Sequence, residues 1–185
     1  MNYWQTEFVR LRGVEPDDGE TFWRWNQDSE MARNLDFVWP PVSAAQVRGW
    51  AESVAEKKLD GDSFDWVIEN SEGAQVGFIH THNCHPRSGV FAYGVGIEAH
   101  HRRKGYAAAA ILLVLRYYFQ ELRYQKVNVT MHSENVASRA LHERLGFLHE
   151  GTLRRAVFTG GRYLDTFCYG LTVEEWEERD GETGQ

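Results

Sequence analysis

A short basic segment between an alternating stretch and an alanine-rich stretch carries the clearest chemical signal in the sequence. It lies within Tyr93–Ala110 (YGVGIEAHHRRKGYAAAA), and its cationic residues gather at 100–104. The residues before it predict a strand, and the apolar run after Gly105 predicts a helix. The start of a helix exposes unpaired N–H groups and the positive end of its dipole. We therefore expect this segment to bind a phosphate or pyrophosphate.

Two common phosphate-binding loops are excluded here. The segment has no Gly-Lys-Ser/Thr ending, and no G-x-G-x-x-G stands at its strand-to-helix turn. The remaining pattern is Arg102-x-x-Gly105-x-Ala107. Taken alone, it is equally compatible with a solvated basic turn before a core helix. As a binding loop, Gly105 would allow close approach of the backbone, while Arg103 and Lys104 would add charge.

A second segment, residues 135–147, places polar side chains at helical spacing. Asn135, Ser138 and His142 fall on one face at 3.6 residues per turn. Apolar residues fall on the neighbouring face: Ala137, Leu141 and Leu145. A helix that lines a ligand cleft needs such a pair of stripes. The alternative is a helix capped by Asn135, with Ser138 and His142 only solvated.

Together, the two segments resemble the motifs of the GNAT superfamily of N-acetyltransferases. The first matches its R/Q-x-x-G-x-G/A pattern, with Ile97 at the apolar position before it. The second (NVASRALHERLGF) resembles its N-x-x-S-x-x-L-x-x-x-L-G-F stretch, one strand downstream. Residues 10–12, 150–154 and 161–171 resemble the branch that acetylates the N-termini of ribosomal proteins. The resemblance spans about Phe8 to Val173.

This resemblance implies transfer of an acetyl group from acetyl-CoA to an amine, and we expect no metal. The strand amides near Val95 and Ile97 would hold the pantetheine and polarise the thioester carbonyl. Gly94 and Gly96 make a bulge or close ligand approach plausible in that strand. The cofactor-binding residues implied are Val95, Ile97, Arg102, Arg103, Lys104, Gly105, Tyr106, Ala107, Asn135 and Ser138.

Two side chains depart from the family pattern. His142 stands where many members carry a tyrosine that protonates the departing thiolate, and Phe91 stands where the histone-modifying members carry a glutamate base. Our hypothesis is that His142 is the acid, with Ser138 or a bound water as the alternative. The implied catalytic set is therefore His142, Ser138 and Val95. Deprotonation of the amine would go through water, Glu98 or Tyr93, although a core position is favoured for Tyr93.

These residues must be positioned by a single α+β domain over residues 1–175, with a mainly antiparallel sheet of about seven strands flanked by helices. Strands are predicted at Phe8–Arg12, Ser63–Glu69, Ala74–His82, Val90–Ile97, Lys126–His132, Phe147–Val157 and Thr166–Thr172. Helices are predicted from Asp17 or Asp18 through Trp25, from Ser43 through Lys58, and at Tyr106–Leu122 and Asn135–Leu145. The charged residues 176–185 are expected to fray.

Three smaller groups of residues admit a functional and a structural interpretation. A zinc site within residues 80–85 (HTHNCH) competes with a polar hairpin beside the acceptor cleft, which we favour. Four tryptophans near the N-terminal helices could wall an acceptor pocket, but core packing is favoured for most of them: Trp23, Trp25, Trp39 and Trp50. Three acidic residues could attract a cationic acceptor or simply be solvated: Asp28, Glu30 and Asp36.

Composition limits the remaining functions. The net charge of −7 disfavours a protein that coats nucleic acid. We find no signal peptide and no stretch long enough to span a membrane, and two cysteines give no disulfide framework. We expect a cytoplasmic enzyme, with a homodimer left open, whose acceptor is a small amine or a protein N-terminus. The alternative is a CoA-binding sensor or inactive relative.

Overall fold

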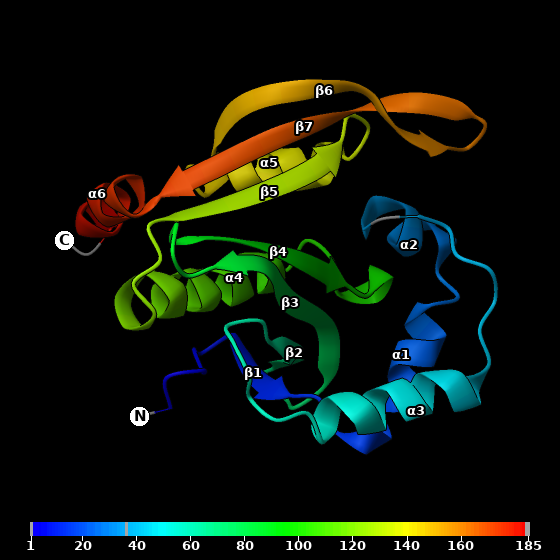
Figure 1. Ribbon diagram of the computed structural model, residues 1–185. Helices are drawn as coiled ribbons and strands as arrows, with labels where there is room; N and C mark the ends of the chain where they lie inside the picture. The colour runs from blue at the N-terminus through cyan, green and yellow to red at the C-terminus, as the bar shows by residue number, and fades with distance from the viewer. Residues whose placement is uncertain (1, 36, 184–185) are drawn as a thin grey trace. The chain divides into compact units, whose positions relative to one another are not determined.

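The computed structural model describes residues 2–35 and 37–183 (Figure 1). Seven strands form a sheet in the order β1-β2-β3-β4-β5-β7-β6. They are β1 (Val9–Gly13), β2 (Asp65–Asn70), β3 (Gln75–His85), β4 (Val90–Ile97), β5 (Lys126–His132), β6 (Leu148–Thr159) and β7 (Arg162–Thr172). The helices are α1 (Gly19–Trp25), α2 (Ser29–Leu35), α3 (Ala44–Ala55), α4 (Tyr106–Arg116), α5 (Val136–Arg144) and α6 (Val173–Thr183).

The predicted α+β class with a mainly antiparallel sheet of about seven strands is confirmed. The pairs β1–β2, β2–β3, β5–β7 and β6–β7 are antiparallel, and β4 pairs with β5 in parallel. The contacts within the chain divide it into two compact units. The first comprises Met1–Thr81 with Gly94–Leu113, and the second comprises His82–Tyr93 with Val114–Gln185.

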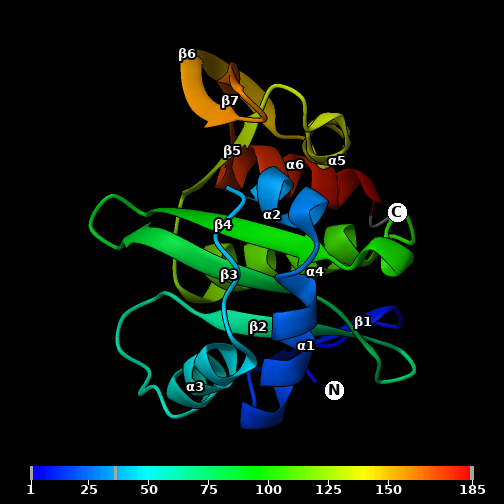
Figure 2. The same ribbon diagram turned by 90° about the vertical axis from the view of Figure 1, so that its right-hand side faces the viewer.

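In the first unit, a cluster of apolar side chains joins the N-terminal helices to β2. Its members are Val14, Phe22, Trp25, Met31, Val47, Ala51 and Val67. Helices α1 and α3 pack against each other (Figure 2). Ser43 caps helix α3 as predicted: its hydroxyl accepts from the N–H of Gln46, while the Gln46 side chain accepts from the N–H of Ser43.

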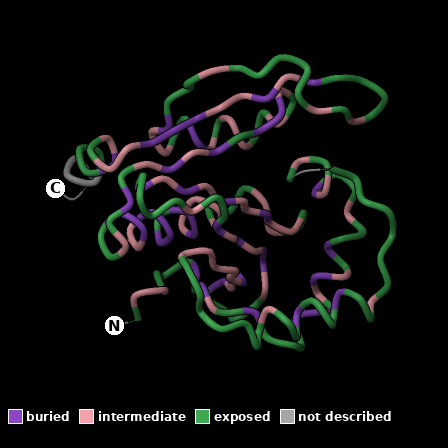
Figure 3. The backbone as a smooth tube through the Cα atoms, in the orientation of Figure 1, coloured by how far each residue is buried: buried purple, intermediate pink, exposed green. Residues whose placement is uncertain are grey.

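In the second unit, β5 pairs with both β4 and β7 and carries alternating buried residues. Phe91 of β4 is fully buried and stacks on Tyr118, with ring centroids 4.0 Å apart. Figure 3 shows buried residues along β5 and β7, whereas β6 is exposed over most of its length. Strand β6 contributes little to the core, because it pairs on one edge and carries mainly polar or exposed side chains.

Three elements differ from the sequence prediction. Helix α2 was not predicted, because its seven residues are too few to show a helical period. The long helix predicted for 106–122 is α4 followed by a π-helical turn at Tyr117–Glu121. Of the residues 176–185 that were expected to fray, those up to Thr183 belong to α6. Trp176 fixes this helix by packing on Phe119 with 7% of its surface exposed. The single-domain boundary at residue 175 stays a prediction.

Candidate functional site

The basic segment forms the predicted strand, turn and helix within the first unit. Strand β4 ends at Ile97, a single 3-10 turn covers Ala99–His101, and α4 begins at Tyr106. Arg103 and Gly105 both have left-handed backbone conformations, with φ of 64° and 86°. A Cβ built on Gly105 would meet nothing within 4 Å, so the space beside the loop is open. This opening is what close approach of a ligand to the backbone requires.

The residues that follow keep the helix start accessible. The N–H of Ala109 donates to the carbonyl of Gly105 at 3.1 Å and closes the first turn, so the amides before Ala109 precede the regular helical ladder. Ala107 and Ala108 carry no bulky side chain, while Arg103 and Lys104 are exposed. An open αL glycine, a helix N-terminus and two exposed cations fit the pyrophosphate of acetyl-CoA.

The two glycines of β4 make room for protein side chains. A Cβ on Gly94 would lie 2.5 Å from the ring of His80, and one on Gly96 would lie 2.6 Å from Cε of Met31. Packing against these side chains therefore explains why both positions are glycine, and no ligand is needed to account for them. This strand does depart from regular pairing. Among the described residues, its pairing with β5 covers Val90–Ala92 and stops there. The roles expected of Val95 and Ile97 stay proposals.

In the second unit, the helix predicted from Asn135 is present as α5. The Asn135 side chain caps it by accepting from the N–H of Ser138 at 3.1 Å. Gly146 follows the helix with a φ of 93°, the left-handed conformation expected after a helix end. On the polar face, His142 is buried, with 3% of its surface exposed, whereas Asn135 and Ser138 are half-buried. Ala137 of the expected apolar face is exposed.

His142 is held by hydrogen bonds at both ring nitrogens. The Tyr93 hydroxyl lies 2.9 Å from Nε2, and the carbonyl oxygen of Ser138 lies 2.8 Å from Nδ1. A carbonyl oxygen only accepts, so Nδ1 must carry the proton of the neutral ring. Nε2 is then bare and accepts from the Tyr93 O–H. Sequence reasoning missed this pair, because no local pattern relates residues 49 positions apart.

Burial sets the protonation of both partners. Desolvation lowers the pKa of His142, and the hydrogen bond to the Ser138 carbonyl opposes that change in part. Burial also raises the pKa of the Tyr93 hydroxyl well above its usual value. The expected core position of Tyr93 is confirmed, with 6% of its surface exposed. The pair is therefore a neutral imidazole and a neutral phenol at pH 7.

The guanidinium of Arg102 is engaged within the first unit. It donates to Glu30 Oε1 at 2.8 Å, to Asp28 Oδ2 at 3.3 Å and, through Nε, to the carbonyl of Ile97 at 3.2 Å. Asp28 and Glu30 are thus each paired with a cation of the protein. Asp36, the third acidic residue considered, lies outside the described residues.

The other candidate residues have structural surroundings. Trp25 lies in the core cluster and Trp23 packs against it, as predicted, whereas Trp39 is 65% exposed. His80 stacks on Phe78, and Cys84 Sγ lies 3.9 Å from the Tyr118 hydroxyl. Among the described residues no three His, Cys, Asp or Glu side chains gather as a metal-binding set. Nor does any described helix have the length and apolar character needed to span a membrane.

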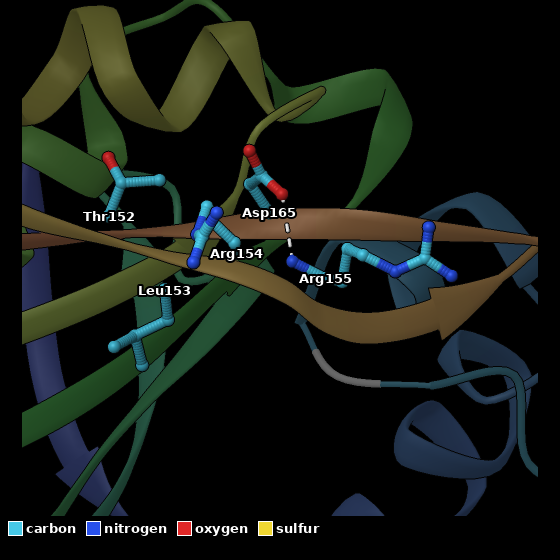
Figure 4. Close-up of a pocket in the computed structure, with 5 residues that line it drawn as sticks. All are labelled: Thr152, Leu153, Arg154, Arg155 and Asp165. Carbon is cyan, nitrogen blue, oxygen red and sulfur yellow. Dashed lines mark hydrogen bonds between the residues drawn. The ribbon is translucent and has the colours of Figure 1, made fainter.

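An open hollow lies beside the bulge of β6 (Figure 4). Its lining residues are Thr152, Leu153, Arg154, Arg155 and Asp165. Arg155 has a φ of 54°, and its N–H donates to Asp165 Oδ1 at 2.8 Å. None of the residues predicted to bind the cofactor lines this hollow, so we assign it no part in the chemistry.

Comparisons with known proteins agree with this fold. A family model described as "Acetyltransferase (GNAT) domain" matches residues 9–148. The chain is 41% identical over 181 residues to the SPbeta prophage-derived uncharacterized N-acetyltransferase YokL of Bacillus subtilis (strain 168), covering 98% of this chain and 99% of that protein. The chain therefore belongs to the GNAT acetyltransferase family, and it is an acetyl-CoA-dependent acetyltransferase.

Two further relatives differ in what their names say of the acceptor. The putative ribosomal N-acetyltransferase YdaF of B. subtilis (strain 168) is 29% identical over 92% of this chain and 94% of its own length. A spermidine N(1)-acetyltransferase of Vibrio cholerae is 28% identical over 54% of this chain and 58% of its own length. A crystal structure of spermidine N-acetyltransferase from V. cholerae with CoA and spermine has a TM-score of 0.81, covering 93% of this chain and 99% of that one. At 20% identity it shows the shared fold alone.

Proposed function

We propose that this enzyme transfers the acetyl group of acetyl-CoA directly to a primary amine, which is either a protein N-terminus or a small amine. The observation that carries the proposal is the open turn between β4 and α4, where Gly105 has a φ of 86° and nothing lies within 4 Å of its missing Cβ. Acetyl-CoA supplies an activated carbonyl and a thiolate leaving group. A neutral amine needs little more than orientation and polarisation of that carbonyl to react.

In this proposal the turn holds the pyrophosphate. The backbone from Arg102 to Ala107, including the amide of Tyr106, donates at the start of α4, and the exposed side chains of Arg103 and Lys104 add positive charge. The amides near Val95 and Ile97 hold the pantetheine, and that of Val95 polarises the carbonyl. Asn135 and Ser138 contribute from the start of α5. Removing one oxyanion donor typically costs about 2.7–4 kcal/mol of transition-state stabilisation, so the Val95 amide would be the largest single contribution.

The hydrogen bonds of His142 restrict its proposed role as acid. The neutral ring uses its proton toward Ser138 and presents a bare Nε2, which accepts and does not donate. Only the imidazolium could protonate the thiolate, and burial disfavours it by lowering the pKa of His142. The Ser138 hydroxyl or a bound water is the alternative donor. His142→Phe separates them: kcat unchanged from pH 6 to 9, with acetyl-CoA still bound, would remove His142 from the mechanism.

Two relatives and one structural fact bear on the nature of the acceptor. The name of YdaF supports a protein N-terminus, and that of the V. cholerae relative supports a polyamine. Asp28 and Glu30 are neutralised in part by Arg102, which weakens the case for a polyamine drawn to them. A homodimer and a cytoplasmic location remain predictions of the sequence.

The test is release of free CoA thiol from acetyl-CoA in the presence of a panel of acceptors. The panel contains peptides beginning with alanine or serine, the same peptides with a blocked N-terminus, and spermidine. Turnover with free but not blocked peptides assigns a protein N-terminus, and turnover with spermidine assigns a small amine. Protection against thermal unfolding by acetyl-CoA, without turnover on any amine, would refute the proposed transfer and leave a CoA-binding sensor.

A further inference from the structure

Arg102 is the charged residue of the cofactor motif, yet its guanidinium lies among anions of the protein. Glu30 Oε1 and Asp28 Oδ2 stand 2.8 and 3.3 Å from its terminal nitrogens, and the side chain is 30% exposed. Two carboxylates beside one guanidinium leave a net negative charge. A pyrophosphate is repelled by such a charge, so this side chain is poorly suited to bind it.

The same two acidic residues form the start of α2. Asp28 Oδ1 accepts from the N–H groups of Glu30 and Met31, both at 3.0 Å, and so caps this short helix. Met31 follows with 4% of its surface exposed, and a Cβ on Gly96 would come within 2.6 Å of its Cε. Helix α2 therefore rests directly on β4 at Gly96.

The Arg102 side chain connects the end of β4 to the start of α2. Its Nε donates to the carbonyl of Ile97, the last residue of β4, while its two other donors bind the start of α2. Gly96 lies between Val95 and Ile97, the residues proposed to hold the thioester. The position of α2 on this strand is thus tied to the first residue of the phosphate turn.

We propose that Arg102 is a positioning residue for the amine acceptor and that its side chain is no pyrophosphate ligand. The inference rests on the proposed function, since it concerns where the amine meets the thioester. Arg102 fixes α2 against β4, and α2 limits the approach to the strand beside Val95 and Ile97. The pyrophosphate is held by the loop backbone, Arg103 and Lys104.

The experiment compares variants that break the contact from either side. Arg102→Gln removes the cation, and the double variant Asp28→Asn with Glu30→Gln removes the anions while the asparagine still caps α2. Arg103→Gln tests an exposed cation of the same loop. Arg48→Gln, which loses only an exposed contact to Glu20 at 3.7 Å, is the control for a missing surface arginine.

Three quantities are measured on the full chain: the acetyl-CoA Kd by calorimetry, the amine KM, and hydrogen exchange of residues 28–35. Arg102→Gln and the Asp28/Glu30 double variant should each raise the amine KM about fivefold, the size expected for two partly exposed ion pairs. They should change the acetyl-CoA Kd less than about twofold and speed exchange in 28–35. Combining all three substitutions should add nothing further, because Arg102→Gln and the double variant each already break the same two ion pairs.

The opposite pattern overturns the proposal. If Arg102→Gln weakens acetyl-CoA about as much as Arg103→Gln, while the Asp28/Glu30 variant leaves it unchanged, then Arg102 is a phosphate ligand. Unchanged exchange in 28–35 for Arg102→Gln would also refute the positioning role. Should no amine be turned over by the wild-type chain, the proposed function fails, yet the exchange and acetyl-CoA binding still decide the role of Arg102.

Discussion

Replacing Tyr93 by phenylalanine removes one hydroxyl from a buried hydrogen bond and leaves the ring in place. In the wild-type chain the Tyr93 O–H lies 2.9 Å from Nε2 of His142, and the two residues are 6% and 3% exposed. Tyr93→Phe leaves Nε2 buried without a donor, which costs about 1–3 kcal/mol. At about 2–4 °C per kcal/mol for a chain of this size, a cost near 2 kcal/mol lowers the Tm by about 4–8 °C.

A double-mutant cycle isolates this interaction. His142→Leu leaves the Tyr93 hydroxyl without its acceptor, and it also removes the donor to the Ser138 carbonyl at 2.8 Å. The loss at Ser138 occurs in both arms of the cycle and cancels. The variant carrying both substitutions removes donor and acceptor together, so its destabilisation should fall short of the sum of the single variants by about 1 kcal/mol or more.

The assay is thermal and urea unfolding of the four proteins at pH 8, where His142 is neutral. Tyr163→Phe is the matched control, because Tyr163 is 55% exposed and the same hydroxyl loss should change stability by less than about 0.5 kcal/mol. Additive effects of Tyr93→Phe and His142→Leu, within about 0.3–0.5 kcal/mol, would refute the hydrogen bond and the tautomer derived from it.

Three further changes test other contacts. Burial lowers the pKa of His142 in the folded chain below its unfolded value of about 6.5. The stability that depends on neutral His142 is therefore fully present above about pH 6.5 and is lost as the pH falls toward the folded pKa. His142→Leu should flatten the dependence of Tm on pH between 7 and 5. Gly146→Ala should lower the free energy of unfolding by more than about 1 kcal/mol in urea, because φ is 93° and the new Cβ would lie 2.4 Å from Cδ of Arg179. Gly61→Ala is the control for backbone strain alone, because Gly61 has a φ of 75° and open space around its missing Cβ. Asp18→Asn should cost about 3 kcal/mol in the same assay, since the Asp18 side chain is 3% exposed and Arg12 binds it at 2.7 and 2.8 Å.

Elements with signals in adjacent residues were predictable from the sequence. Asn135 before the apolar positions and Gly146 after them indicate where α5 begins and ends, and both are confirmed by the cap and the left-handed φ. Ser43 likewise indicates the start of α3. These signals are local because a helix end is satisfied by side chains one turn away. The turn before α4 was predictable for the same reason, since its glycine and the helix that follows are adjacent in the sequence.

The contacts that define the candidate site are long-range and have no local signal. Arg102 meets Asp28 across 74 positions, and Tyr93 meets His142 across 49. A polar residue on a helix face is predicted to be solvated unless a partner across the fold is known. For this reason the sequence allowed a lining role for His142, whereas the structure buries its ring. Phe91, noted as a missing base, is a core residue stacked on Tyr118.

The departure from a tyrosine at position 142 is consistent with a reaction that needs no strong acid at that point. A thiol has an ordinary pKa of about 8.5, so the departing thiolate is a weak base that water can protonate near neutral pH. A donor from the protein therefore lowers the barrier only modestly, whereas polarisation of the carbonyl acts on the charge that develops in the transition state. A neutral His142 with its proton on Nδ1 directs its free lone pair to Tyr93, which fixes the β4 residue two positions before Val95. The ring can thus support the strand proposed to hold the thioester without exchanging a proton with the substrate.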